Sequence, residues 1–362
     1  MKKKRFNSVF VLLSVLALTS CGGKTSVSGN KGSASVSDKE QETSAAPYTP
    51  VTIKTYNANN EEITQTFTKA PERVIVGNLS SAEIRIALGL KDKVVGRVNP
   101  DNKVTGEYAE TVNSFKRLGD KKTISYETIL NEDPDFIFGR SASFAISKVG
   151  GSAKAGNFGT PEELNKLDIN RYAQKASVNK KDVSLEDILT DITNIGKIFH
   201  VEEKANEYVT SLTGKLKTIQ TKIKEKNIST SENFRNALIR TGYGKKDSSS
   251  AETYGVFKSN LQENRLNSIG YTNYFGSNVS GVTYTVENLN VQNPDLIIYV
   301  TSDRNKAKDD TAFELRKANA ALSDVPAVKN DKRIKINYDD FRDYGRRNFT
   351  ALETIFNFAY GN

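Results

Sequence analysis

The sequence predicts an α/β protein made of two similar lobes, each with a mainly parallel central sheet flanked by helices, joined by a single long helix. The first observation behind this prediction is an internal repeat. Residues 125–137 and 285–297 each read as a short helix, a Pro-Asp break and a buried apolar strand, and a Glu precedes the Pro by seven residues in both copies. The second observation is the strongly helical segment between the copies, residues 184–227. Two lobes bridged by a helix are the simplest arrangement of these parts.

The bridging segment divides at His200 into two helices. Apolar residues recur three or four positions apart along residues 185–198, and Ser184 with an acidic residue three positions later is typical of a capped helix start. Residues 201–227 contain no Pro and carry their own apolar stripe. At about 1.5 Å per residue this second helix would span roughly 40 Å, which is longer than one small domain needs. We expect His200 to serve the turn between the two helices.

The composition favours a globular protein of two domains and excludes several kinds of site. The chain has 362 residues, a formal net charge of +9, one histidine, one cysteine and one methionine, Met1. Four of the positive charges belong to the amino-terminal leader, and no arginine–aromatic cluster accompanies the others, so we expect no nucleic-acid partner. One histidine cannot build a multi-histidine metal site, and one cysteine cannot form a disulfide within the chain. Because Met1 would be lost with the leader, haem ligation by His and Met is excluded too, which leaves His200 or a tyrosine as an axial ligand.

The first residues are typical of a lipoprotein leader. Residues 1–20 combine a basic start with an apolar run that is too short to span a bilayer comfortably, and we interpret them as a signal peptide. The sequence Leu-Thr-Ser-Cys that ends at Cys21 resembles the bacterial lipobox, in which the cysteine receives lipid after cleavage. Residues 21–48 are rich in Gly, Ser, Thr, Lys and Glu and predict a disordered tether. We therefore expect a protein anchored by lipid to the cell membrane and facing outward; a free or structural thiol is the alternative for Cys21.

The remaining domain boundaries follow from the repeat and the bridging segment. We predict a first lobe at residues 49–200, a linking helix at residues 201–227 and a second lobe at residues 228–362. The first lobe begins with residues 51–67, which alternate around an Asn-rich turn and predict a β-hairpin.

Buried strands in the first lobe alternate with helices, as in a parallel sheet. The predicted strands are residues 73–76, 94–96 and 136–138. Ligand-contacting loops of such sheets lie at the carboxyl ends of the strands. These ends carry Asn78, Arg97 and the loop 139–144, which contains Arg140.

Two helices of the first lobe are predicted from their start signals. Residues 80–83 are typical of a helix N-terminus, so Glu83 is interpreted as a capping residue, and Gly89 ends this helix. Pro161 starts the other helix, which is predicted to lead to Ile169 and Tyr172.

The second lobe repeats the scheme. It has predicted strands at residues 237–239, 296–300 and 333–336, and a terminal helix at about residues 348–358. Arginine and tyrosine again follow the strands. They are Arg240 and Tyr243 after the first strand, Arg304 after the second, and Arg342 and Tyr344 after the third.

Together these features resemble a known family. The lipobox, the two lobes, the linking helix and the Ala-Pro-Glu-Arg-Val sequence at residues 70–74 are similar to the helical-spine class of ABC-transporter substrate-binding proteins. The resemblance covers the chain from about Val51 to the end and implies two Rossmann-like lobes with a ligand cleft between them. The class carries ferric siderophores, haem and cobalamin.

Three loops resemble those of Gram-positive-type binders of catecholate siderophores. Residues 139–144, Gly-Arg-Ser-Ala-Ser-Phe, look like their Gly-Arg-x-Ser-x-Phe loop, and the Asp-Arg pair that ends at Arg304 looks like their second-lobe loop. Tyr344 lies about where they carry a Tyr-rich loop. Their Tyr-Gly-x-x-Ser-Arg-Phe-Gly motif is matched only in part by the sequence that begins at Tyr254, which lacks the Arg, and Arg240 is a candidate substitute.

The resemblance implies that arginine and tyrosine hold the ligand. A ferric tris-catecholate complex is close to a trianion, and guanidinium groups pair with its oxygens through charge-assisted hydrogen bonds. The candidate ligand-binding residues are Arg97, Arg140, Arg240, Tyr243, Tyr254, Arg304, Arg342 and Tyr344. No residue is assigned as a metal ligand, and no cofactor is expected. The alternative for Arg140 or Arg304 is a helix-terminal or surface ion pair.

The resemblance also implies partners. In this family one glutamate on each lobe docks into arginine pockets of the membrane permease, and Glu127 and Glu287 occupy matched places in the repeat. Solvated helix residues are the alternative. We expect a monomer that binds a small iron chelate and meets an ABC permease dimer with its ATPase.

The predicted function is therefore capture of a ferric siderophore and its delivery to an ABC importer, without enzymatic activity. Haem and cobalamin are the alternative ligands. A surface enzyme is the less favoured class, because the chain has no Gly-x-Ser-x-Gly elbow and no phosphate-binding Gly-Lys-Ser loop. A surface adhesin would fit the tether but does not require paired lobes.

Overall fold

The computed structural model describes most of the chain after the tether. The described residues are 47–57, 61–98, 104–118, 126–144, 158, 164–178, 180–241, 255–256, 260–273, 286–301, 307, 310–311, 313–314 and 320–361. Tyr48–Asn362 form one compact unit, and Met1–Pro47 belong to another. The compact unit is a mixed α/β fold of two lobes, as predicted, and each lobe contains a sheet of mainly parallel strands flanked by helices.

The predicted hairpin is confirmed at the start of the compact unit. Strand β1 (Val51–Tyr56) pairs with the antiparallel strand β2 (Glu62–Phe67). The hairpin is fastened to the first-lobe sheet by the buried Thr55 hydroxyl, which accepts a hydrogen bond from the backbone N–H of Ala173 at 2.9 Å.

The first-lobe sheet has the strand order β4-β3-β5-β6, and each neighbouring pair is parallel. Its strands are β3 (Val74–Val76), β4 (Val94–Arg97), β5 (Phe136–Arg140) and β6 (Asn170–Gln174). Every residue of β3 is fully buried, as are the first three of β5, which explains their unbroken apolar sequences.

Strand β6 corrects the prediction that a helix reaches Ile169 and Tyr172. Residues 170–174 are extended and pair along their whole length with β5. The reversal that precedes the strand occurs at Asp168, whose φ of 54° is left-handed. The strand is mostly polar in sequence, so neither helical nor strand periodicity distinguishes it.

Helix α1 (Leu79–Ala87) begins two residues earlier than the Ser-x-x-Glu signal suggests. Its N-cap is Asn78, whose side chain accepts a hydrogen bond from the Ser81 N–H at 2.9 Å, while the Ser81 hydroxyl accepts one from the Asn78 N–H at 3.1 Å. The assignment of Glu83 as a capping residue is therefore wrong, because Asn78 and Ser81 already complete the cap. The predicted end at Gly89 is confirmed by its φ of 73°.

The other helical elements of the first lobe whose bounds the structure describes are short. They are η1 (Lys91–Lys93), α2 (Ala109–Ser114), α3 (Tyr126–Leu130), η2 (Ser141–Phe144) and η3 (Lys175–Ser177). Both η2 and η3 directly follow a strand of the sheet.

Helices α5 (Leu185–Ile198) and α6 (Glu202–Glu225) form the predicted bridging pair. The capping box at the start of α5 is confirmed, with the Asp187 carboxylate accepting the Ser184 N–H at 2.9 Å. The helices lie side by side, and α6 continues beyond α5 to contact the second lobe at helix α12 (Arg347–Tyr360). A Cβ atom on Gly196 would come within 2.4 Å of the Ala205 Cβ, so only glycine permits this close approach.

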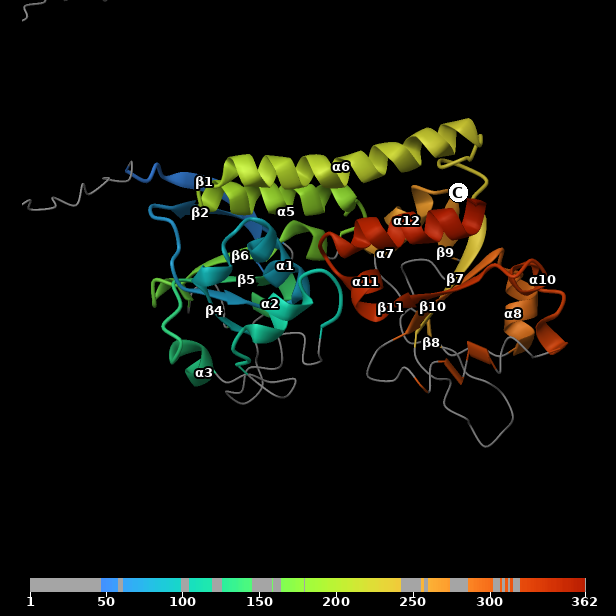
Figure 1. Cartoon of the computed structure of the whole chain (residues 1–362), viewed down its shortest axis with the longest axis horizontal. Coiled ribbons are helices and arrows are strands. Elements are labelled where there is room, and N and C mark those ends of the chain that lie inside the picture. The colour runs from blue at the N-terminus through green and yellow to red at the C-terminus, as the bar shows by residue number, and fades with distance from the viewer. Residues whose placement is uncertain are drawn as a thin grey trace, which may run out of the picture. The chain divides into compact units, whose positions relative to one another are not determined.

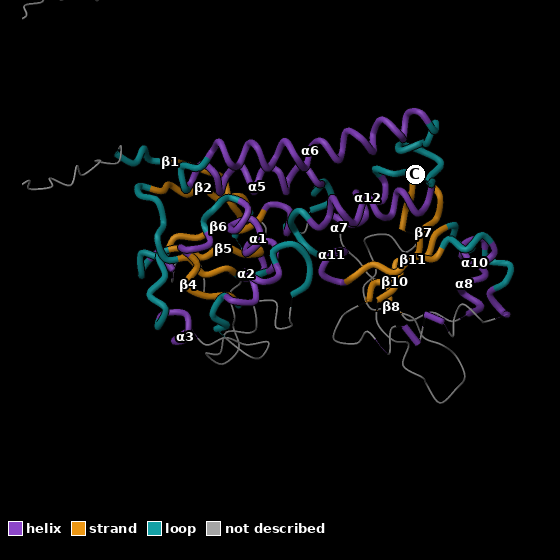
Figure 2. The backbone as a smooth tube through the Cα atoms, in the orientation of Figure 1, coloured by secondary structure: helices purple, strands orange, loops and turns teal. Residues whose placement is uncertain are grey.

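The second-lobe sheet has the order β11-β10-β7-β8, and β9 also pairs with β7. Strands β7 (Arg235–Thr241), β9 (Tyr271–Asn273), β10 (Leu296–Thr301) and β11 (Arg333–Asn337) pair in parallel, whereas β8 (Gly255–Val256) is antiparallel to β7. Figure 2 shows the helices around this sheet. The helical elements of this lobe whose bounds the structure describes are α7 (Asn260–Asn267), α8 (Val286–Gln292), η5 (Ala320–Leu322), α10 (Pro326–Lys329), α11 (Tyr338–Arg342) and α12.

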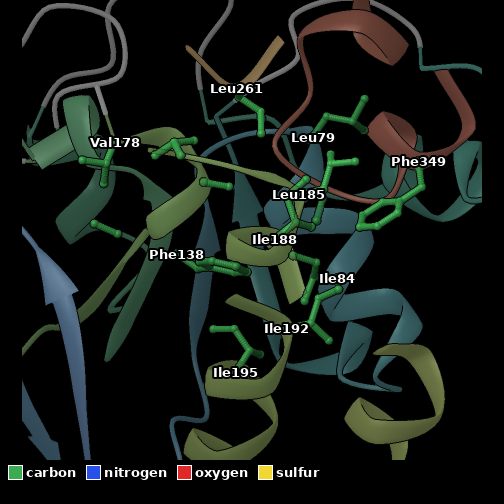
Figure 3. Close-up of a cluster of buried hydrophobic side chains, with 14 of the residues drawn as sticks. Leu79, Ile84, Phe138, Val178, Leu185, Ile188, Ile192, Ile195, Leu261 and Phe349 are labelled. Atoms are coloured by element: carbon green, nitrogen blue, oxygen red, sulfur yellow. The ribbon is translucent and has the colours of Figure 1, made fainter. Parts of the chain in front are cut away.

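The two faces of the second-lobe sheet pack into different cores. Along β10, Ile298 and Val300 join the main core, which also contains the first-lobe strands, α5 and α12. The intervening Ile297 and Tyr299 point to a smaller core with residues of α8 and α10. Figure 3 shows part of the main core, where Phe349 of α12 and Leu79 of α1 lie near the buried face of α5. One continuous apolar core therefore includes parts of both lobes.

The internal repeat has the same structure in both lobes. Helix α3 or α8 is followed by a residue with positive φ, Asp133 at 46° or Asn293 at 50°, and then by a buried Pro. The next residue, Asp135 or Asp295, accepts hydrogen bonds from the backbone of a neighbouring strand segment. The repeated Pro-Asp therefore fixes how adjacent strands align, which is a structural reason for its recurrence.

No helix within the described part of the chain is both long and apolar enough to cross a membrane.

Removing the two repeated carboxylates should destabilise the fold unequally. Asp135 accepts the N–H groups of Glu72 and Arg73, each at 2.9 Å, whereas among the described residues Asp295 accepts only that of Asn236, at 3.0 Å. We expect Asp135→Ala to lower the free energy of unfolding by about 1.5–3 kcal/mol and Asp295→Ala to lower it less. Urea denaturation measures both, with the exposed Asp324→Ala as the control. Equal stability of Asp135→Ala and the control would contradict this role.

Candidate functional site

The carboxyl ends of the first-lobe strands meet along one edge of the sheet, because the strands are parallel. Arg97 ends β4, Arg140 ends β5 and Gln174 ends β6. Arg140 and Gln174 are direct partners in the register of β5 and β6. Asn78 follows β3 at the same edge. The structure thus brings together the strand-end residues that the sequence singled out and adds Gln174 to them.

Arg140 is the candidate cation most available to a ligand at this edge. Its side chain is half-buried, and its Nε atom is buried without a hydrogen-bond partner among the described residues. No carboxylate within those residues forms an ion pair with it. The Ser143 hydroxyl in the next turn is also buried and without a described partner. The alternative of an ion pair for Arg140 thus finds no support in the described part of the chain.

Gln174 connects this edge to the second lobe. Its side-chain oxygen accepts a hydrogen bond from the Asn78 amide at 2.6 Å, and its Nε2 atom donates to the Ser80 hydroxyl at 3.0 Å. The same Nε2 atom lies 3.4 Å from the Tyr344 carbonyl oxygen, to which it donates. Gln174 is fully buried, and its amide can satisfy these different partners because it carries both donors and an acceptor. Sequence reasoning missed it because strand β6 was interpreted as part of a helix.

The turns behind the strand ends are held by buried polar contacts. The Ser177 hydroxyl in η3 accepts the backbone N–H of Ser141 at 2.9 Å. The buried Asp191 carboxylate on α5 accepts the N–H groups of Lys175 and Ala176 and the hydroxyl of Tyr172. Burial raises the pKa of Asp191 to about 7, although these hydrogen bonds favour its ionised form. The loop after Arg140 is thus supported from the bridging helix.

Tyr344 lies between α11 and α12 in the second lobe and is half-buried. Arg342, the last residue of α11, holds its guanidinium carbon 5.1 Å from the ring centre of Tyr338. Arg97 is only 4% exposed, and its backbone pairs with residues 116 and 118. Arg97 is therefore much less accessible to a ligand than Arg140.

The other predicted ligand residues belong to the second-lobe strand ends. Arg240 is the penultimate residue of β7, and its Cα pairs with that of Tyr299 on β10; its side chain lies outside what the structure describes. The predictions for Tyr243, Tyr254 and Arg304, and for the lipidation residue Cys21, also fall outside the described residues. Because β10 is parallel to β7 and β11, its last residue, Thr301, lies at the same sheet edge as Arg240.

The predicted docking residues occupy matched places on short helices. Glu127 is the second residue of α3 and is exposed, and Glu287 is the second residue of α8. The structure describes the backbone of Glu287 but not its side chain.

His200 lies in the turn between α5 and α6, as predicted, with a φ of 50°. Its ring stacks on that of Tyr48 at a centroid distance of 4.1 Å, and its Nε2 lies 3.1 Å from the Thr49 carbonyl oxygen. Within the described ranges, no three His, Cys, Asp or Glu side chains gather in a group that could hold a metal ion.

Two lobes with parallel sheets, a bridging helix pair and polar residues at the strand ends define a binding protein of the two-lobed transport type. A match to the periplasmic binding protein family extends over residues 74–339, and the chain belongs to that family. It is a family of binding proteins and not a class of enzymes.

One curated relative and two solved structures illustrate the similarity. The chain is 28% identical over 359 residues to YvrC of Bacillus subtilis, named as an ABC transporter substrate-binding lipoprotein, with 98% of this chain and 96% of YvrC covered. It resembles a periplasmic binding protein from Veillonella parvula with a TM-score of 0.68 and 21% identity over 86% of this chain and 92% of the other. The petrobactin-binding protein YclQ of Bacillus subtilis gives a TM-score of 0.60 and 17% identity, covering 86% of this chain and 100% of YclQ. At these identities the structural matches establish the fold.

Proposed function

We propose that the protein captures an anionic ferric siderophore between the strand-end loops of its two lobes and delivers it to an ABC importer for iron uptake. Membership of the periplasmic binding protein family supports the binding role, and similarity to a substrate-binding lipoprotein supports the importer. In this proposal the ligand is cargo, and the protein itself needs no cofactor.

Arg140 carries the proposal of an anionic ligand. It ends the strand of the first repeat copy, its Nε atom is buried without a described acceptor, and the neighbouring Gln174 amide is already bonded to Asn78 and Ser80. A guanidinium in such surroundings gains most from an acceptor with delocalised negative charge, which the oxygens of a ferric catecholate or carboxylate chelate provide. Arg304 follows the equivalent strand, so an anion could be held by one arginine from each lobe.

Native mass spectrometry with a panel of ferric siderophores, haem and cobalamin would identify the ligand class. We expect an anionic ferric chelate to bind and Arg140→Ala to weaken it by about ten- to a hundred-fold, since one charge-assisted contact contributes about 1.5–3 kcal/mol. Arg304→Ala should have a similar effect. Tyrosine fluorescence can provide the titration, because the chain contains 15 Tyr and no Trp.

Two controls distinguish charge from geometry. Arg140→Lys keeps the charge but loses the planar fork, so we expect a smaller loss of affinity. Lys91→Ala removes an exposed cation elsewhere in the first lobe and should bind as the wild type does. The thermal midpoint of the ligand-free Arg140→Ala protein should hardly change. Wild-type affinity in both the Arg140→Ala and Arg304→Ala proteins would remove these residues from the site, and preferential binding of haem or cobalamin would replace the proposed ligand.

We further propose that Cys21 carries a lipid that anchors the protein to the outer face of the cell membrane. The lipobox-like sequence before Cys21 and the lipoprotein character of YvrC support this anchor. Cys21→Ala should shift the protein from the membrane fraction to the medium. Intact mass spectrometry of the wild type should show cleavage before Cys21 and added acyl chains; an unmodified and uncleaved amino terminus would contradict the anchor.

Delivery is proposed to use Glu127 and Glu287 as contacts with the permease dimer. Their equivalent places in the internal repeat would present one carboxylate from each lobe to the two halves of a dimeric transporter. The monomer is the expected form, because each lobe then supplies one of the two contacts.

The double variant Glu127→Ala/Glu287→Ala should bind ligand normally but fail in transport. We expect cellular uptake to fall about ten-fold or more, because each lost charge-assisted contact weakens docking by about 1.5–3 kcal/mol. The control is Glu110→Ala/Glu225→Ala, which removes two other exposed carboxylates. Radioactive iron uptake measures the rates, and wild-type uptake by the Glu127→Ala/Glu287→Ala variant would refute the docking assignment.

A further inference from the structure

A buried ion cluster joins the middle of α1 in the first lobe to the start of α12 in the second. Glu83 of α1 is 1% exposed, and its carboxylate lies 2.9 Å from the Arg347 guanidinium and 3.4 Å from that of Arg346. Arg347 also bonds Asp340 at 2.7 Å and donates to the Thr105 carbonyl oxygen at 2.5 Å. Its guanidinium thus bonds two residues of the first lobe and one of the second.

The two arginines lie at the amino-terminal end of α12, where a positive charge destabilises a helix. Arg346 is the N-cap of α12 and Arg347 its first residue, and the first turn of this helix contains no acidic residue. The positive end of a helix dipole repels cations there. An arginine pair in this place therefore depends on the carboxylates that meet it from outside the helix, and Glu83 is the most buried of them. Coulombic attraction to Glu83 helps to raise the pKa of Arg347 despite its burial.

The loop just before α12 packs closely against the first lobe beside this ion cluster. A Cβ atom on Gly345 would come within 2.8 Å of the Ser80 Cβ, so this position accepts only glycine. The backbone carbonyl oxygen of the neighbouring Tyr344 accepts a hydrogen bond from Gln174. Burial raises the pKa of Asp343, and the negative charge of Glu83 nearby raises it further. The loop that carries Tyr344 is thus in contact with α1 and with β6, both of the first lobe.

The second lobe holds the same segment from the other side. The Asn348 side chain donates to the Asp343 carbonyl oxygen and accepts a hydrogen bond from the buried Arg265 of α7 at 2.5 Å. Gln262 of α7 donates to the Phe341 carbonyl oxygen at 3.0 Å. Because α7 fixes residues 341–348 within the second lobe, a force that Glu83 exerts on Arg346 and Arg347 acts on the whole lobe and not on a loose loop.

We propose that Glu83 is a positioning residue for ligand binding, which holds Tyr344 at a fixed place opposite the first-lobe strand ends by pairing with Arg346 and Arg347. This inference rests on the proposed function, since it assumes that ligand lies between these loops. Glu83 itself does not touch the ligand in this arrangement. Its carboxylate instead sets the relative position of the lobes before the ligand arrives. This lowers the entropic cost of ligand binding, because the lobes are already ordered.

The test separates lobe position from ligand affinity. Cysteines replace the exposed Lys91 and Lys329, one in each lobe, in a chain whose Cys21 is changed to Ser, and spin labels on them report the distance between the lobes. Glu83→Gln keeps the shape of the side chain but removes its charge. We expect a broader or shifted distance distribution in the ligand-free Glu83→Gln protein, and Arg347→Lys should change it in the same direction because it loses the planar fork.

Glu107→Gln is the matched control, because Glu107 pairs with the same Arg346 at 2.5 Å but is 63% exposed. An exposed ion pair contributes little, so its distance distribution should match the wild type. A Glu83→Gln distribution identical to those of the wild type and of Glu107→Gln would overturn the proposal. This part of the experiment needs no ligand, so its result is independent of whether the proposed function is correct.

Measurements of ligand affinity then test whether Glu83 acts through Tyr344. If the competent arrangement falls to about one-tenth of the population, the dissociation constant of the bound ferric chelate rises about ten-fold in Glu83→Gln. In a Tyr344→Ala background the same change should have much less effect, because both substitutions act through one contact. Full additivity, or wild-type affinity in a Glu83→Gln protein with altered lobe distances, would overturn the positioning role. If no chelate of the panel binds the wild type, the proposed function fails, and the distance measurement alone decides whether Glu83 fixes the lobes.

Discussion

Burial of both sheets on both faces is the constraint that determines where this protein can place polar chemistry. The central strands β3 and β5 are apolar along almost their whole length, and β10 alternates between two separate cores. A charged side chain within such strands would have to leave water without a partner. Polar residues therefore concentrate where the parallel strands end, and all strands of a sheet that run the same way end at one edge. The candidate site is a consequence of this packing.

The contacts between the lobes follow the same principle. Gln174 ends a buried strand and finds its partners partly in its own lobe and partly in the Tyr344 backbone. Glu83 lies on the buried face of α1, where the Asn78 cap leaves its carboxylate free to meet the arginines of α12. The main apolar core extends through the bridging helices and α12 near these polar contacts. Apolar and polar interactions thus join the lobes in the same region.

Local sequence signals were sufficient for much of the fold but not for the contacts between distant segments. The apolar runs of β3, β5 and β10, the capped start at Ser184 and the repeated Pro-Asp were recognisable because each depends on neighbouring residues. Strand β6 was missed because residues 170–174 are mostly polar and owe their extended form to pairing with β5. Glu83 was misassigned because Ser-x-x-Glu also matches a capping box, whereas its true partner Arg347 is 264 residues away. The place of Arg140 at the end of a strand was predictable from the sequence, whereas that of Gln174 was not, because its contacts arise only when two strands and a second lobe meet.

The stacking of His200 on Tyr48 has a consequence for the ferric cargo proposed above. The imidazole, the only one in the sequence, is engaged by an aromatic ring and a backbone carbonyl oxygen at the turn between α5 and α6. If the cargo is the ferric chelate proposed above, a side chain that completes the coordination of the iron is then a phenolate or a carboxylate and not an imidazole. Such charged oxygen donors bind the trivalent ion more strongly than the divalent one, because the attraction between opposite charges grows with the charge of the ion. Reduction of the metal would therefore weaken any such bond, so that the oxidation state of the cargo, and not only its shape, would govern its retention.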